Sequence, residues 1–195
     1  MRPAVFIDKD GTLVEDVPYN VDPVRVRLAA GALPALRRVA DAGFALVVVT
    51  NQSGIARGFY PESAVETIGR HLTEVLARDG VTLDAFLYCP HLPDAAVAEY
   101  RLACDCRKPE PGLIRRACAE LGLAGDRSWM LGDIATDVLA GQAAGCRTVL
   151  VNPHPEPELA QLSRKPDLVA HSLPEAADAL LSATLSRDVA PVQPS

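Results

Sequence analysis

Short apolar segments alternate with longer amphipathic segments along the chain, and this alternation restricts the fold more than any other feature of the sequence. We expect strands in the apolar segments at 4–8 (AVFID), 44–50 (FALVVVT), 84–89 (DAFLYC), 128–133 (SWMLGD), 147–151 (RTVLV) and 167–170 (DLVA). Several are apolar throughout, which is typical of strands that helices cover on both faces. Helical patterns are expected at 31–42, 61–79, 111–122, 134–144 and 173–183. This order predicts an α/β fold with a doubly wound, mostly parallel sheet.

The length and the apolar content indicate a single domain. At 195 residues, of which 49% are apolar, the chain is long enough to bury a core of its own. We assign residues 1–183 to this domain. Residues 184–195 lose the helical periodicity and gain proline, so we expect a flexible tail there.

The charge balance limits the partners of the protein. The chain has 19 Lys and Arg residues against 25 Asp and Glu residues, a net charge of -6, which argues against binding to nucleic acid or to an anionic membrane. Neither a signal peptide nor an apolar run of the roughly 20 residues that cross a bilayer is evident. We therefore expect a cytoplasmic monomer in which any anionic ligand meets a local positive site.

Polar residues gather where the expected strands end. In doubly wound folds ligands bind beyond the carboxyl ends of the strands. The residues at these ends are Asp8, Asp10, Thr50, Asn51, Lys108, Asp133 and Asp137. Several carboxylates in one cleft of low dielectric would repel one another, so a divalent cation is implied, and oxygen ligands suit Mg²⁺. The lysine and the threonine hydroxyl would then hold a phosphate group.

Less specific roles also exist for some of these aspartates. A turn cap would explain Asp8 and Asp10 taken alone, but it does not explain the polar residues at the other strand ends. For Asp137 we favour a charge at a helix start, stabilised by the helix dipole, over direct contact with the metal.

A second group of residues has the composition of a zinc site. Cys89 and His91 lie in "CPH", and Cys104 and Cys106 lie in "CDC" farther along the chain. Three sulfurs and an imidazole suit a closed tetrahedral Zn²⁺ site that stabilises the loop 89–106. Disulfide pairing is the alternative, and a reducing cytoplasm disfavours it.

Four motifs of the sequence resemble, in order, those of the haloacid dehalogenase (HAD) superfamily of phosphotransferases. They are "DKDGT" after the first expected strand, "TN" after the second, the lysine of "RKPEP", and "GDIATD", and they extend over residues 4 to 150. The resemblance implies a Rossmann-like HAD fold. It does not imply a separate cap domain, because only about forty residues separate the first two motifs.

The resemblance also implies roles for the strand-end residues. Asp8 would be the nucleophile that forms an aspartyl-phosphate, and Asp10 would protonate the leaving oxygen and then activate water. Thr50 and Lys108 would bind the phosphoryl group. The magnesium ligands would be Asp8, the backbone carbonyl of Asp10, and Asp133.

The zinc loop, together with "TNQSGIARG" and "CDCRKPEPG", narrows the resemblance to the heptose bisphosphate phosphatases and the related histidinol-phosphate phosphatases. The former remove the 7-phosphate of a small phosphorylated sugar, D-glycero-D-manno-heptose 1,7-bisphosphate, in lipopolysaccharide synthesis. Short loops contact the substrate in those enzymes. The corresponding residues here are Asp16 to Tyr19, Thr50, Asn51, Gln52, Ser53 and Arg107.

One position departs from the pattern of the heptose enzymes. They usually carry a basic residue after the "GD" of the last motif, where this chain has Ile134. The resemblance therefore supports the reaction more strongly than the substrate and its anomer. Three alternatives stay open: a phosphatase of histidinol phosphate or another small molecule, transfer of the phosphoryl group to an acceptor other than water, and a non-enzymatic binding module stabilised by zinc.

Overall fold

Six parallel strands form one sheet in the computed structural model, which describes residues 1–151 and 157–188. Their spatial order is β3-β2-β1-β4-β5-β6, so the chain starts in the middle of the sheet and builds outward in both directions. The strands are β1 (Ala4–Ile7), β2 (Ala45–Asn51), β3 (Ala85–Cys89), β4 (Trp129–Gly132), β5 (Arg147–Val151) and β6 (Leu168–Ala170). Each lies within one residue of its expected bounds. The predicted doubly wound α/β fold is confirmed.

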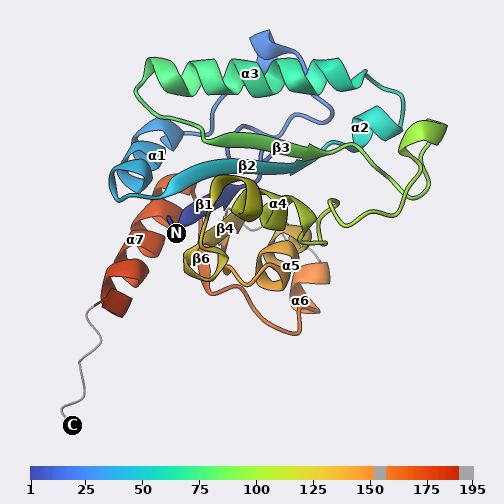
Figure 1. The fold of residues 1–195 in the computed structure, drawn as a ribbon. Coiled ribbons are helices and arrows are strands. Elements are labelled where there is room, and N and C mark those ends of the chain that lie inside the picture. The colour runs from blue at the N-terminus through green and yellow to red at the C-terminus, as the bar shows by residue number, and fades with distance from the viewer. Residues whose placement is uncertain (152–156, 189–195) are drawn as a thin grey trace.

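Helices cover both faces of the sheet, as Figure 1 shows. Alternate residues of β1 point to opposite faces: Val5 and Ile7 pack in one core cluster, and Ala4 and Phe6 in another. The first cluster includes residues of α1, α3 and α7, and the second includes residues of α4 and α5. This arrangement explains why the central strands are apolar throughout. The bounds of these helices are α1 (Ala32–Asp41), α3 (Glu62–Arg78), α4 (Gly112–Leu121), α5 (Ala135–Ala143) and α7 (Leu173–Asp188).

The final helix corrects one expected boundary. We expected the helix to end at 183, but α7 continues to Asp188, so 184–188 are helical rather than part of a tail. Within this extension the indole of Trp129 donates a hydrogen bond of 3.4 Å to the hydroxyl of Thr184, which links the helix to β4. Residues 189–195 of the expected tail lie outside the described residues.

Several short helices connect the main elements. They are α2 (Ser53–Ala56), α6 (Pro157–Ala160), and the 3-10 helices η1 (Pro23–Arg25), η2 (Ala98–Tyr100) and η3 (Gly125–Arg127). None of the helices within 1–151 and 157–188 combines the length and the apolar character that a membrane span requires.

Candidate active site

Three carboxylates meet at the carboxyl ends of two neighbouring strands. Asp8 follows β1 and Asp133 follows β4, and these strands are paired in the sheet. Asp137 lies in the first turn of α5 and is fully buried. One oxygen of each carboxylate lies within 4.8 Å of the others. We call these three residues the aspartate cluster.

A buried lysine lies against two members of the aspartate cluster. The Nζ of Lys108 is 2.5 Å from Oδ1 of Asp8 and 2.6 Å from Oδ1 of Asp137, and it donates a 3.0 Å hydrogen bond to the carbonyl of Val49. Burial lowers the pKa of Lys108, but the charges of Asp137 and Asp8 outweigh burial and leave this pKa raised. The lysine therefore stays protonated at neutral pH.

The aspartate cluster has more negative charge than Lys108 can balance. Burial, followed by the charges of Asp8 and Asp137, raises the pKa of Asp133 to about 7. The hydroxyl of Thr12 donates a long 3.4 Å hydrogen bond to Asp133. A divalent cation among these oxygens would remove the repulsion. The donor set of the aspartate cluster thus fits Mg²⁺.

Two glycines make room for the aspartate cluster. Gly11 has a φ of 79°, and a Cβ there would lie 2.2 Å from Oδ2 of Asp133. A Cβ on Gly132 would lie 2.2 Å from Oδ2 of Asp137. The glycine in "DKDGT" is therefore required both for the turn and for the approach of the carboxylate from β4.

Asp137 has two roles in the structure. Its Oδ2 accepts a 3.3 Å hydrogen bond from the backbone N–H of Ile134, at the start of α5. Its Oδ1 faces Lys108. The helix-start role that we expected is present, and the pairing with the lysine is an additional one.

Asp10 lies beside the cluster with its own polar contacts. It forms an ion pair with Lys9, and its Oδ2 accepts a 3.2 Å hydrogen bond from the amide of Gln52. Burial raises the pKa of Asp10, and the charge of Lys9 opposes this only in part. A carboxyl with a raised pKa beside the aspartate cluster is suited to donate a proton and later accept one.

Two adjoining cavities open at this edge of the sheet. The strand-end cavity has a volume of about 210 Å³ and the loop cavity about 290 Å³. Asp10, Asp16 and Asn51 line both. The strand-end cavity is further lined by Asp8, Thr50, Lys108, Asp133 and Ile134, and the loop cavity by Val17, Pro18, Tyr19, Asn20, Gln52, Ser53, Gly54 and Tyr60. The expected catalytic residues thus share one cavity, and the two expected substrate loops share its neighbour.

Arg107 is the expected site residue that lies elsewhere. It lines neither cavity, and its guanidinium donates a 3.3 Å hydrogen bond to the carbonyl of His91.

Asn51 also has a role that we did not expect. Its side-chain amide donates to the carbonyl of Lys108 and accepts from its backbone N–H, both at 3.0 Å, so it holds the lysine's backbone in place.

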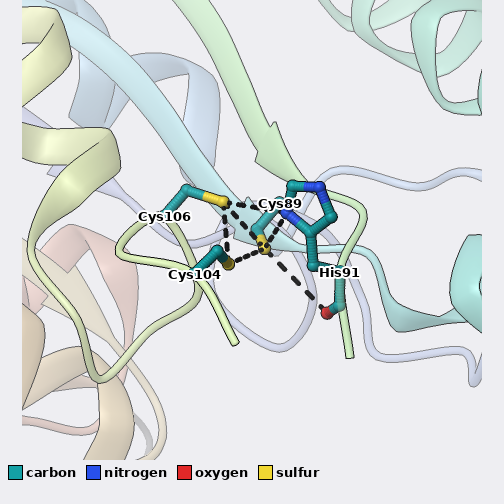
Figure 2. Close-up of side chains that lie close together, drawn as sticks. All are labelled: Cys89, His91, Cys104 and Cys106. Carbon is teal, nitrogen blue, oxygen red and sulfur yellow. Dashed lines mark hydrogen bonds between the residues drawn. The ribbon is translucent and has the colours of Figure 1, made fainter. Parts of the chain in front are cut away.

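The second predicted metal site is also brought together in the structure (Figure 2). It consists of Cys89, His91, Cys104 and Cys106, which we call the cysteine cluster. Cys89 ends β3, and the other two cysteines lie in the loop before α4. The Sγ of Cys106 is 3.1 Å from each of the other two sulfurs and 3.3 Å from Nδ1 of His91. All three cysteines are free, so the disulfide alternative is not what the structure shows. Three sulfurs and a ring nitrogen facing one another fit Zn²⁺.

Comparison with known proteins places the chain in a family. Residues 105–176 match the HAD-hydrolase-like protein family. The D-glycero-beta-D-manno-heptose-1,7-bisphosphate 7-phosphatase of Salmonella typhi is 38% identical over 178 residues, which cover 91% of this chain and 95% of the relative. The enzyme of the same name from Escherichia coli (strain K12) is 39% identical and is covered to 93%. The chain belongs to the HAD superfamily of phosphatases. As a member of this superfamily, it is an enzyme rather than a zinc-stabilised binding module.

A solved structure agrees with this assignment. D,D-heptose 1,7-bisphosphate phosphatase from B. bronchiseptica, complexed with magnesium and phosphate, is 30% identical to this HAD phosphatase. The alignment has a TM-score of 0.79 and covers 93% of this chain and 99% of that chain. The HAD fold implied by the four motifs is thereby confirmed over nearly the whole chain.

Three residues with polar contacts in this site were not predicted from the sequence, and one of them is Thr12, which bonds to Asp133. Lys9 is buried and pairs with Asp10, and the hydroxyl of Tyr60 donates a 3.1 Å hydrogen bond to Gln52. The position of Lys9 within "DKD" was a usable signal, because a lysine between two site aspartates can pair with either. Nothing in the segment around Tyr60 marks it in the sequence.

Proposed function

We propose that this HAD phosphatase removes the 7-phosphate of D-glycero-D-manno-heptose 1,7-bisphosphate through an aspartyl-phosphate intermediate. The observation that carries the proposal is the pair of adjoining cavities. One collects the aspartates, Lys108 and Thr50, and the other collects the two substrate loops. The names of the relatives from Salmonella typhi and Escherichia coli support the choice of substrate.

Asp8 is the proposed nucleophile. An oxygen of its carboxylate attacks the phosphorus, and the bond from phosphorus to the sugar oxygen breaks. Lys108 and the hydroxyl of Thr50, which line the same cavity, bind the phosphoryl oxygens. Asp8, the backbone carbonyl of Asp10 and Asp133 would hold Mg²⁺, which would supply positive charge that offsets the repulsion between the carboxylate and the phosphate.

Asp10 is the proposed general acid and base. Burial raises its pKa and so favours the protonated form, which can give its proton to the leaving sugar oxygen. Once it has given up this proton, the same carboxylate takes one from water, which attacks the aspartyl-phosphate. Inorganic phosphate then leaves and Asp8 is restored.

The loop cavity is the proposed site for the sugar. Asp16 and Ser53 offer an acceptor and a hydroxyl to sugar hydroxyls, and Tyr19 offers an aromatic ring. Tyr19 is half exposed, has a φ of 55°, and meets the exposed ring of Phe59 edge to face at a centroid distance of 4.7 Å. The loop Asp16 to Tyr19 therefore contacts the segment that follows α2, and the loops around this cavity are proposed to select the substrate without a cap domain.

The proposal is tested by Mg²⁺-dependent release of inorganic phosphate. We would compare kcat/KM for both anomers of the heptose bisphosphate with histidinol phosphate and with simple sugar monophosphates. A preference of several decades for one heptose anomer is the expected result. Comparable slow rates on every compound would overturn the substrate assignment, and a preference for histidinol phosphate would favour that alternative. Formation of an alkyl phosphate from an added alcohol, in place of inorganic phosphate, would indicate phosphoryl transfer.

A further inference from the structure

A chain of three side chains leads from the loop cavity to the proposed general acid. The hydroxyl of Tyr60 donates a 3.1 Å hydrogen bond to Oε1 of Gln52. The Nε2 of Gln52 donates to Oδ2 of Asp10 at 3.2 Å and to the hydroxyl of Thr50 at 3.0 Å. Gln52 is buried, so its amide depends on these partners rather than on bulk water.

The hydroxyl of Tyr60 helps to fix which way the amide of Gln52 faces, because it binds the end opposite to Asp10. An amide has one accepting end and one donating end, and a carboxylate such as Asp10 can only accept when ionised. Burial, followed by the charge of Asp10, raises the pKa of Tyr60 to about 12, so its hydroxyl keeps its proton. Because that hydroxyl donates to Oε1, the NH₂ of Gln52 must face Asp10 and Thr50. Without the hydroxyl, Oε1 of Gln52 loses its hydrogen-bond donor, and only the contacts of Nε2 with Asp10 and Thr50 still hold the amide.

The ring of Tyr60 is held close to the backbone of α2. A Cβ on Gly54 would lie 2.3 Å from Cζ of this ring and 2.4 Å from its hydroxyl. Only glycine therefore allows the ring to reach Gln52 from its place after α2. The hydroxyl is positioned by packing as well as by its hydrogen bond.

We propose that Tyr60 is a positioning residue of the reaction, which acts through the amide of Gln52 to hold the carboxyl of Asp10 in place for proton transfer. The inference rests on the proposed function, since it assumes that Asp10 is the acid and base. It reassigns Gln52 from contact with the substrate to orientation of Asp10. The hydroxyl of Tyr60 thus contributes to the chemical step without touching the phosphate.

The test is the Tyr60→Phe variant, which removes one hydroxyl and keeps the ring. Its matched control is Tyr88→Phe, because the hydroxyl of Tyr88 also donates a side-chain hydrogen bond, to Glu62 at 2.9 Å, but lines neither cavity. With the heptose bisphosphate and Mg²⁺, we expect Tyr60→Phe to lower kcat about tenfold with KM within about twofold of the wild type. Tyr88→Phe should keep the wild-type kcat.

A double-variant cycle tests the route through Gln52. Gln52→Leu removes the amide, and we expect it to lower kcat at least as much as Tyr60→Phe does. If Tyr60 acts only through this amide, adding Tyr60→Phe to Gln52→Leu should change kcat by less than about twofold. Independent, multiplying effects would overturn the inference.

Other outcomes also decide the question. Wild-type kcat in Tyr60→Phe, or a raised KM with unchanged kcat, would overturn the positioning role, and the second result would mean that Tyr60 contacts the substrate. An equal loss in Tyr88→Phe would show that the effect is structural. Failure of the wild-type protein to release phosphate from any substrate would instead count against the proposed function, so the two failures are distinguishable.

Discussion

The aspartate cluster and the cysteine cluster are built alike but differ in what surrounds them. In each, the ligand atoms lie within 4.8 Å of one another. The aspartate cluster is paired with a lysine, Lys108, and opens into the strand-end cavity. The cysteine cluster has four ligands of its own, and none of them lines either cavity. A metal in the first has room for a substrate, whereas a metal in the second is already fully coordinated.

From this difference we expect the aspartate cluster to serve the reaction and the cysteine cluster to stabilise the fold. Repelling carboxylates beside a cavity cost folding energy, which a catalytic role explains. Thiolates around a structural metal stabilise the loop that carries them. Substitutions should therefore affect the rate at the aspartate cluster and the melting temperature at the cysteine cluster.

The largest effect is expected from Asp8→Asn. The amide oxygen cannot serve as the nucleophile, so kcat should fall by at least about 10⁴-fold. The fold should survive, because Lys108 keeps Asp137 at 2.6 Å as its partner. We expect a Tm within about 5 °C of the wild type by calorimetry. Phosphate release at the normal rate would contradict the nucleophile assignment.

The next largest effect is expected from Cys104→Ser, which should lower the melting temperature more than the rate. Loss of one thiolate weakens zinc binding, and we expect Tm to fall by about 10 °C. Elemental analysis should find about one equivalent of zinc in the wild type and far less in the variant. Because Lys108 lies close to the cluster in sequence, kcat should also fall, but less than tenfold.

Cys118→Ser is the matched control for this experiment. Cys118 lies in α4, is half buried and is not part of the cysteine cluster. It should keep both the zinc content and most of the Tm. Zinc-free, disulfide-linked wild-type protein would refute the structural zinc site.

Local sequence signals explain how much of the site was predictable. Asp8 and Asp133 each follow a strand that is recognisable from its own apolar residues, and parallel strands bring such ends to one edge. The partners of Lys108 were not predictable in this way. The lysine is 100 positions from Asp8 in the sequence, and their contact depends on how the loop before α4 packs.

The direction in which each side chain points could not be predicted from the sequence either. Arg107 stands next to Lys108 in the chain, yet one side chain reaches the carbonyl of His91 and the other reaches the aspartate cluster. Tyr60 acts on Gln52 only because Gly54 leaves space for its ring. Such relations depend on the packed backbone, which no local pattern encodes.

A third prediction concerns the connection between the two clusters. Asn51, at the end of β2, makes two 3.0 Å hydrogen bonds to the backbone of Lys108, just after the loop that carries the cysteine cluster. Asn51→Ala should displace the lysine and lower kcat/KM about tenfold, or about 1.4 kcal/mol. The zinc content should stay at the wild-type level. Loss of zinc in this variant would mean that the two clusters form one unit rather than two.

The smallest effect is expected from Ile134→Arg, which adds a cation to the cavity beside the aspartate cluster. Ile134 lines the strand-end cavity at the start of α5. A guanidinium there can bind the second phosphate of the substrate. The positive end of the dipole of α5 disfavours a cation at this position, so we expect KM for the bisphosphate to fall only about fivefold. KM for the heptose 7-monophosphate, which lacks that phosphate, and kcat for both should be unchanged. Ile134→Leu, as a control without charge, should resemble the wild type. An equal fall in KM for both compounds would show that the arginine binds the reacting phosphate, and Ile134 would then belong to the catalytic end of the cavity.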